Sequence, residues 1–308
     1  MTTFADMAFD LGGRPLGGGQ FTSPWQTHYF VDGTDGSDAN DGTAPSRSKA
    51  TIQAAVTAAG RGDIIYVRPL AYTSDASDVN RYSEAVTVPY ATADLSLIGV
   101  SNTHHGNPNY GAKLQHTTAS GTALTVNAPA FHIENMCVRA EGADYAIRFP
   151  YDGTDYTTVA GACGPTMYNV VIRGSLNGVR FDGGYAYWVA KCRFEGGSAT
   201  DHALYLDGST TPQRRGVVEN CYFGGFNGAL NDNAYIRILG ATTDWLCRDC
   251  EFGIIPNDTH FINATGTNLG LGTRLWFDSA DMTLSTGIVK GGITYVGLYD
   301  ATMAVPAG

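Results

Sequence analysis

Charged residues are scarce in this chain. They make up 16% of its 308 residues, well below the usual quarter. The shortage is greatest among residues that favour helices, since the sequence contains four lysines and six glutamates. A helical bundle is therefore not expected, and a fold built from strands and turns is.

A surplus of positive charge is also missing. The formal net charge at pH 7 is −10, whereas binding to phosphate groups needs clustered lysine and arginine. The one basic pair, Arg214-Arg215, is too short to change this balance and is expected to lie in a solvated loop. Nucleic acid is therefore not expected as a partner.

Long apolar runs are absent as well. No segment approaches the roughly 18 consecutive apolar residues that span a bilayer, so no membrane insertion is expected. Residues 1–20 (MTTFADMAFDLGGRPLGGGQ) carry neither a basic leader nor a continuous apolar segment, which predicts no secretory signal. If Met1 is the natural start, we expect synthesis in a host cytosol and a non-secretory exit, such as assembly into a virion. An extracellular or cell-surface location is the alternative.

What the chain does contain is glycine, with 39 residues, and an internal repeat. The repeat reads polar, apolar, variable, apolar, variable, small, which is the pattern of a strand with every second side chain inward. The copies begin 34, 22, 29 and 29 residues apart and occupy residues 135–139, 169–174, 191–196, 220–224 and 249–253. Three copies start with Asn135, Asn169 and Asn220, which are expected to line up at a turn and to hydrogen-bond along the stack.

A second short strand follows each copy, at residues 146–149, 178–181, 203–206, 235–238 and 259–262. Strands that recur once per turn, with no helix-length segment between them, must stack in parallel. The sequence therefore predicts an all-β fold, a parallel β-helix. We assign residues 28–285 to the solenoid, with a capping helix near 51–59, residues 1–27 to a flexible N-terminal arm, and 286–308 to a C-terminal tail.

The cysteines fit the same repeat. Cys192, Cys221 and Cys250 occupy one template position and are expected to form an inward stack. Buried cysteine behaves as a small apolar residue, so a packing ladder is favoured over disulfides or a metal site. Cys247 and Cys250 form a CxxC pair, but no second pair lies at zinc-finger spacing.

The segment before the repeat resembles a known family. It contains HYFVDGTDGSDANDG (28–42), then KATIQAAVTAAG (49–60), then GDIIYV (62–67). This order is similar to the N-terminal part of the pectate-lyase-like superfamily, whose members often begin with a VDGxxGSDxNDG turn, an ATIQAAV helix and a GDxIYVxP strand. The resemblance implies a right-handed parallel β-helix with the amphipathic helix closing its open end. It does not imply one function, because this fold hosts lyases, hydrolases, adhesins and virus spikes.

The catalytic motifs of the best-known enzymes with this fold are not found. Pectate lyases carry WxDH and RxPxxR elements, but here Trp188 is followed by Val-Ala-Lys and no such arginine motif occurs. Polygalacturonases carry NTD, DD and GHG elements, and the sequence has no GHG. Asp182 and Asp207 end equivalent strands on successive turns and are weak catalytic candidates, since two carboxylates can hydrolyse a glycoside. The alternative for both is turn capping at Asp-Gly.

Two binding sites are also considered. The Asp-rich turn with Asp32, Asp35, Asp38 and Asp41 offers oxygen ligands for a structural Ca²⁺, although Asx turns explain it about as well. An aromatic cluster suits the stacking of sugar rings, unless its members fill the interior. It consists of Tyr151, Tyr156, Tyr185, Tyr187 and Trp188. No other cofactor is expected.

Three functions remain open. The first is a non-enzymatic virion structural protein of a phage-like particle, such as a head decoration, fibre or spike component. It would assemble as a homotrimer and contact other virion proteins through residues 1–27 and the C-terminal tail, with surface polysaccharide as a further partner. The second is a polysaccharide lyase or glycoside hydrolase of the phage depolymerase type. The third is a glycan-binding surface adhesin.

Overall fold

The fold was analysed in a computed structural model. It describes residues 26–70, 80–100, 111–118, 121–140, 145–151, 158–174, 177–196, 202–224, 235–253, 262–265, 268–277, 289–290 and 293–300. Among these residues, no helix has the length and apolar character needed to cross a bilayer.

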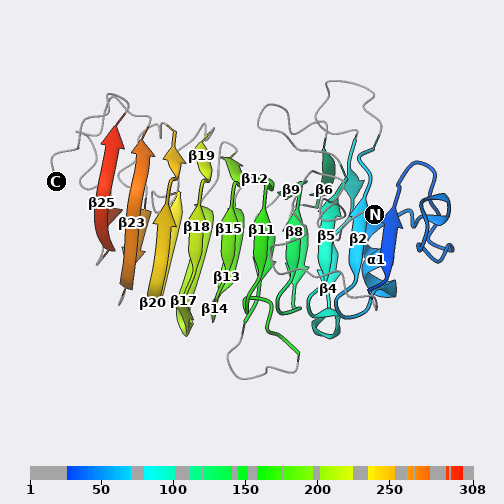
Figure 1. Cartoon of the computed structure of the whole chain (residues 1–308), viewed down its shortest axis with the longest axis horizontal. Coiled ribbons are helices and arrows are strands. Elements are labelled where there is room, and N and C mark those ends of the chain that lie inside the picture. Colours follow the sequence, from blue (N-terminus) through cyan, green and yellow to red (C-terminus); the bar gives the residue numbers. More distant parts are fainter. Residues whose placement is uncertain are drawn as a thin grey trace, which may run out of the picture.

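The chain forms a solenoid of parallel strands (Figure 1). Three ladders of paired strands run along it, which we call A, B and C. Ladder A contains β1 (His28–Val31), β2 (Ile64–Val67), β5 (Ser96–Gly99), β8 (His132–Glu134), β11 (Thr166–Tyr168), β15 (Trp188–Ala190) and β18 (Val217–Glu219). Ladder B contains β3 (Tyr82–Ser83), β6 (Ala112–His116), β9 (Met136–Ala140), β12 (Val171–Gly174), β16 (Arg193–Gly196), β19 (Tyr222–Gly224) and β21 (Glu251–Phe252).

Ladder C contains β4 (Val86–Val88), β7 (Leu124–Val126), β10 (Tyr145–Phe149), β13 (Asn177–Asp182), β17 (His202–Arg214), β22 (Ile262–Thr265) and β24 (Val289–Lys290). Three long strands bend from one ladder into the next: β20 (Ile236–Arg248), β23 (Asn268–Phe277) and β25 (Ile293–Asp300). The short β14 (Gly184–Tyr185) pairs with the end of β17. The predicted repeat is confirmed for its copies in ladder B, which pair in register with one another, and for the first four second strands, which pair in ladder C. The fifth second strand, predicted at 259–262, is wrong in register, because Ile262 begins β22 and pairs with Ile236; residues 259–261 lie outside the described residues.

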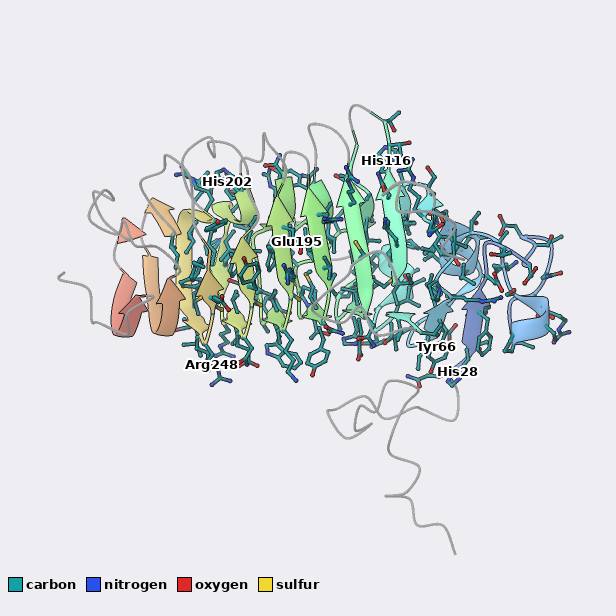
Figure 2. The ribbon with its side chains drawn as sticks, turned by 90° about the horizontal axis from the view of Figure 1, so that it is seen from above. His28, Tyr66, His116, Glu195, His202 and Arg248 are labelled. Carbon is teal, nitrogen blue, oxygen red and sulfur yellow. The ribbon has the colours of Figure 1, made fainter. Side chains whose placement is uncertain are left out.

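Each strand sends alternate side chains into the solenoid. In ladder B, the inward stack includes Phe194, Phe223 and Phe252, whose ring centroids lie 4.6 and 5.0 Å apart in nearly parallel planes. All three rings are buried, so this stack contributes apolar burial together with aromatic contacts. Outward side chains of ladder A, such as His28, Tyr66 and Arg248, lie along one side of the solenoid in Figure 2, opposite His116 and His202.

The corners on either side of ladder A are made by residues with positive φ. Before its strands lie Gly62, Asp94, Ala130, Gly164, Ala186, Arg215 and Asp244; after them lie Asn135, Asn169, Lys191, Asn220 and Asp249. Glycine, asparagine and aspartate tolerate this left-handed conformation best. The predicted asparagine stack is confirmed for one pair, in which Asn169 Nδ2 donates to Asn135 Oδ1 at 2.6 Å.

The predicted thiol stack is also confirmed. All six cysteines are free and buried, and the register of β16, β19 and β21 places Cys192, Cys221 and Cys250 at matching positions of successive turns. Burial raises the pKa of the Cys221 thiol well above its ordinary value, as expected for an inert packing residue.

The capping helix is α1 (Ile52–Ala58), at the N-terminal end of the solenoid (Figure 1). It buries Ile52, Ala55 and Val56 against the first turn. Thr51 caps it by accepting from Ala54 N at 3.2 Å. Glu84, from the next turn, accepts from Ile52 N and Gln53 N at 2.8 and 2.9 Å. Two 3-10 turns are also present, η1 (Pro45–Arg47) before α1 and η2 (Tyr90–Thr92) between β4 and β5.

The described strands of the solenoid begin at His28 and end at Asp300. Strand β1 begins at His28, where the solenoid was predicted to begin, and residues 1–25 of the predicted arm lie outside the described residues. At the other end, β24 and β25 pair in parallel with β22 and β23. Ladder pairing therefore continues to Asp300, beyond the predicted boundary at 285, because this segment keeps strand pairing without keeping the repeat's sequence pattern.

The left-handed corner can be tested at Asn220, which is exposed and has φ of 52°. We expect Asn220→Val to lower the free energy of unfolding by about 1–2 kcal/mol, because a β-branched residue is strained at this φ. Asn220→Gly should stay within about 0.5 kcal/mol of the wild type. The measurement is the urea unfolding midpoint. Glu251→Val, at an exposed and extended strand position, should behave like Asn220→Gly; an equal loss there would contradict the corner's role.

Candidate functional site

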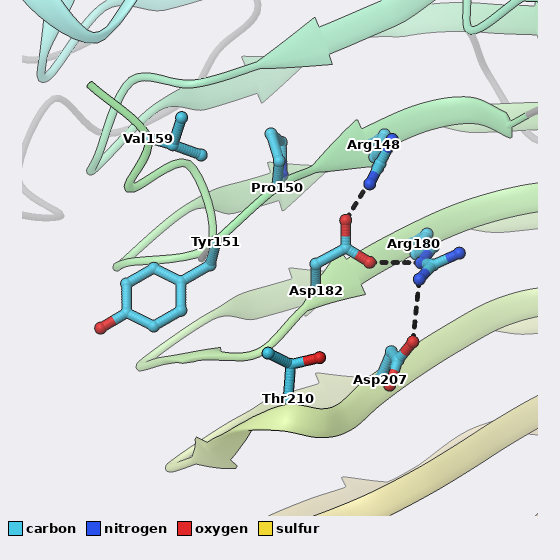
Figure 3. Close-up of a pocket in the computed structure, with 8 residues that line it drawn as sticks. All are labelled: Arg148, Pro150, Tyr151, Val159, Arg180, Asp182, Asp207 and Thr210. Carbon is cyan, nitrogen blue, oxygen red and sulfur yellow. Dashed lines mark hydrogen bonds and ion pairs between the residues drawn. The ribbon is translucent and has the colours of Figure 1, made fainter. Parts of the chain in front are cut away.

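A pocket of about 280 Å³ lies on the outer surface of ladder C (Figure 3). Its lining comes from β10, β13, β17 and the chain between β10 and β11. The lining residues are Arg148, Pro150, Tyr151, Val159, Arg180, Asp182, Asp207 and Thr210. Charged groups lie on one side of the pocket, and the rings of Pro150 and Tyr151 lie on the other (Figure 3).

Strand register gathers the charged side chains. Arg148 of β10 is paired with Arg180 of β13, and Asp182 of β13 is paired with Asp207 of β17. Between Arg180 and Asp182 lies Phe181, which is fully buried. The alternation that sends Phe181 inward therefore sends its neighbours outward, onto the same surface.

Arg180 lies at the centre of this group. Its Nη2 donates to Asp207 Oδ2 at 2.8 Å, and its Nε donates to Asp182. Its Nη1 donates to the Tyr145 hydroxyl at 3.1 Å. The guanidinium carbon also lies 5.4 Å from the ring centroid of Tyr145 and 5.0 Å from that of Tyr205, both within cation–π range.

These contacts hold Arg180 as a cation. Burial by itself lowers its pKa, but the charge of Asp182 and the hydrogen bond from the arginine to Tyr145 outweigh burial and raise the pKa above its ordinary value. The pKa of Tyr205 is raised too, first by burial and then by the negative charge of Asp207. Arg180 is thus a fixed structural link between neighbouring turns.

Arg148 is held much less tightly. Its Nε donates to Asp182 Oδ2 at 2.7 Å, and its side chain is 44% exposed, against 25% for Arg180. Within the described part of the chain, its two Nη groups have no hydrogen-bond partner. Arg148 therefore presents a planar pair of donors at the pocket.

The two predicted carboxylates are thus brought together, as expected from the repeat. Asp207 also caps its turn, accepting from Ser209 N at 3.0 Å and from Ser209 Oγ at 2.5 Å. Asp182 is engaged by both arginines. Turn capping, the alternative considered from the sequence, therefore describes Asp207, whereas Asp182 mainly pairs with arginine.

The aromatic cluster predicted for glycan binding does not form one surface. Tyr151 is 7% exposed at the pocket and Tyr185 is 50% exposed on β14. The prediction that Tyr187 lies at the surface is wrong, because Tyr187 is buried and stacks on Phe181 with ring centroids 4.7 Å apart. Trp188 lies on the outer side of ladder A, where its Nε1 donates to Glu219 Oε1 at 2.7 Å. Tyr156 lies outside the described residues.

The four aspartates of the N-terminal turn do not converge on one point, although two of them, Asp32 and Asp35, both contact Arg68 Nη1. Asp32 pairs with Arg68, and its pKa is lowered because hydrogen bonds from Thr34 N, Arg68 and Asp35 N outweigh burial. Asp38 accepts from Ala50 N and Thr51 N, and Asp41 pairs with Arg47 at 2.9 Å. Across the described ranges, no group of three or more potential metal ligands is found. Calcium binding here stays a prediction, and the Asx-turn alternative accounts for the observed contacts.

Known proteins add information on the fold. No family model matches the sequence, and no curated protein does. Among solved structures, an alginate lyase from Paenibacillus is similar with a TM-score of 0.60 and 14% identity, over 81% of this chain and 83% of that one. A pectin methylesterase from Aspergillus niger has a TM-score of 0.54 and 16% identity, over 91% and 88%. A pectate lyase has a TM-score of 0.55 and 13% identity, over 87% and 67%.

The chain has the pectate-lyase-like fold, a right-handed parallel β-helix. The fold implied by the N-terminal resemblance is therefore confirmed. At this level of identity the likeness shows the fold and assigns no residue a role.

The sequence interpretation missed the arginines of the β-helix pocket. Arg148 and Arg180 occupy the same place in consecutive copies of the second strand, one residue before Phe149 and Phe181. The repeated outward arginine, which at Arg180 lies two residues before Asp182, could have predicted a charged surface at this point of the repeat. Tyr145 gave no such signal, because its part in the site depends on where Arg180 points.

The role of Arg180 can be tested by its removal from the β-helix. Arg180→Leu leaves Asp182 and Asp207 without their shared cation, with side chains only 14% and 10% exposed. We expect a loss of about 3 kcal/mol in the free energy of unfolding, measured by urea denaturation. Adding Asp207→Asn should recover part of that loss. Arg61→Leu, which breaks the exposed pair with Asp94, should stay within about 1 kcal/mol; comparable losses in both variants would contradict the assignment.

Proposed function

We propose that this β-helix binds an acidic polysaccharide at the pocket on ladder C. The observation that carries the proposal is Arg148, a half-exposed guanidinium with both Nη groups directed to no described partner, at the mouth of the pocket. A planar guanidinium matches a carboxylate with two parallel hydrogen bonds. The carboxylate of a uronic acid is such a partner.

The rest of the pocket suits a sugar. Asp182 and Asp207 are acceptors fixed in position by Arg180, and they can receive hydrogen bonds from sugar hydroxyls. Pro150, Tyr151 and Val159 provide an apolar wall for the C–H face of a sugar ring. The two arginines balance the two aspartates, so the pocket is locally neutral on a chain of net charge −10. An anionic ligand therefore meets less repulsion here than the overall charge implies.

The similar structures agree with this class of ligand. Those proteins are named for alginate and for pectin or pectate, which are uronic acid polymers. At 13–16% identity they support the ligand class only as a proposal.

Binding without cleavage is the proposed activity. Glycoside hydrolysis with two carboxyl groups requires one of them to donate a proton. In the pocket both carboxylates accept hydrogen bonds from Arg180, an arrangement that suits two acceptors. The lyase and polygalacturonase motifs are missing from the sequence as well.

We further propose that the β-helix works as a non-enzymatic virion component, a head decoration, fibre or spike that recognises surface polysaccharide. Its support is the stacked, continuously paired solenoid together with the missing enzyme motifs. The proposed assembly is a homotrimer, with residues 1–27 and the C-terminal tail contacting other virion proteins. A surface adhesin would use the same pocket without the particle.

Arg148→Gln tests the ligand site. We expect titration calorimetry to show that the wild type binds oligomers of alginate or polygalacturonate and does not bind neutral dextran. The variant should bind about 10- to 100-fold more weakly, because it loses charge-assisted hydrogen bonds of about 1.5–3 kcal/mol. Arg61→Gln is a matched control, since Arg61 also makes a single Nε pair with a carboxylate, that of Asp94 at 3.0 Å.

Two outcomes would contradict the binding proposal. One is the absence of any interaction of the wild type with both acidic polymers. The other is an equal loss of affinity in Arg148→Gln and Arg61→Gln. Release of reducing ends or unsaturated products in the same mixtures would favour the depolymerase alternative, and Asp182→Asn and Asp207→Asn would then be assayed for loss of cleavage.

The assembly is tested by native mass. Light scattering after gel filtration should give three copies of the 32.7 kDa chain. A monomer at all concentrations would contradict the fibre and spike forms of the proposal. A deletion of residues 1–27 should keep the fold and prevent incorporation into particles; unchanged incorporation would remove the arm from the proposal.

A further inference from the structure

The outer surface of ladder A carries a hydroxyl, an imidazole and a carboxylate in line. Thr166 Oγ1 lies 2.5 Å from His132 Nδ1. On the other side of the same ring, His132 Nε2 lies 3.0 Å from Glu134 Oε2. Both separations are within hydrogen-bond reach, the first slightly shorter than the roughly 2.6–3.2 Å usual between a nucleophile and its base and the second inside that range.

Strand register produces this alignment. His132 and Glu134 are two residues apart on β8, so both side chains leave the strand on the same side. Thr166 begins β11, one turn after β8, and is paired there with His132. All three positions belong to one continuous parallel ladder, which fixes them relative to one another. They share the surface on which Tyr66 and Arg248 are seen in Figure 2.

The hydrogen bonds are consistent with one tautomer. If Nε2 carries the proton and donates to Glu134, Nδ1 is left as the acceptor for the hydroxyl proton of Thr166. The three residues differ in burial: His132 and Glu134 are 1% and 2% exposed, whereas Thr166 is partly exposed. The base and its orienting group are thus shielded, and the hydroxyl is the member nearest to solvent.

We propose that Thr166 is a nucleophile for acyl transfer from a carboxylic ester, with His132 as general base and Glu134 as a positioning residue. Thr166 Oγ1 bonds to the acyl carbon while its proton moves to His132 Nδ1. The bond from the acyl carbon to the ester oxygen then breaks, and that proton passes to the leaving alcohol. Water, deprotonated by the same imidazole, hydrolyses the acyl-threonine and restores the hydroxyl and the acid product. This site is separate from the pocket on ladder C.

The test uses p-nitrophenyl acetate with the full-length protein. We expect release of p-nitrophenol and an acetyl group on the peptide that contains Thr166, detected by mass spectrometry. Thr166→Val keeps a β-branched strand residue and removes the hydroxyl, so it should abolish this acetylation. Thr166→Ser should retain it. His132→Gln should slow the reaction about 10²-fold or more, the usual contribution of a general base.

The role of Glu134 needs a readout other than loss of rate. A neighbouring carboxylate favours the protonated imidazole, so Glu134→Gln should move the pH midpoint of the acetylation rate to a lower pH. On the strands that flank β8, the outward residues are Ser96 and Ile98 of β5 and Thr166 and Tyr168 of β11. Tyr168 is the titratable one among these four. Its substitution by phenylalanine should leave the midpoint in place.

Thr87→Val is the matched control, because Thr87 is an exposed strand threonine on ladder C. It should react like the wild type. Acetylation confined to lysines, or equal at Thr166 in the wild type and His132→Gln, would overturn the proposal. So would p-nitrophenol release that is unchanged in Thr166→Val. Polysaccharide binding measured on the same samples distinguishes this outcome from failure of the ladder C site.

Discussion

Parallel backbone pairing between successive turns is the interaction on which the rest of this molecule depends. Because the pairing is in register, a side chain in one turn lies directly beside its counterpart in the next. Phenylalanine meets phenylalanine inside ladder B, and asparagine meets asparagine at a corner. On the outside the same rule places Arg148 beside Arg180 and Asp182 beside Asp207. Core and surface are therefore ordered by one constraint.

That constraint explains why so much of the fold could be predicted from the sequence. The apolar alternation of the repeat predicts which residues point inward, and the spacing between copies predicts which residues they contact in the next turn. The cysteine stack and the pairing of Asp182 with Asp207 both follow from position in the repeat. The C-terminal turns were missed because β25 keeps the backbone pairing while its sequence departs from the template. Pairing depends on main-chain groups, which the template does not record.

The parts of the site that could not be predicted are those set by corners and by side-chain direction. Simple alternation from Tyr185 would send Tyr187 outward, but Ala186 adopts a positive φ and reverses the order. Tyr187 is therefore buried, and Trp188 faces out. The aspartates of the N-terminal turn show the same limit, because nearness in sequence does not make their carboxylates converge. Asp32 and Asp35 share Arg68, whereas Asp38 and Asp41 bind other amides and another arginine.

The corner between ladders A and B has a consequence for how such a chain can change length. From one strand to the next it contains one or two residues in every turn from β8 to β19, and one of them has positive φ. The connections from ladder B to ladder C and those from ladder C to ladder A both differ from turn to turn, and together they account for the unequal repeat length. Insertions and deletions therefore occur away from the corner between ladders A and B, where a longer connection leaves the neighbouring turns in register. Ladders A and B thus form a constant part of the molecule, and new surface can be added at the other connections without redesign of the scaffold.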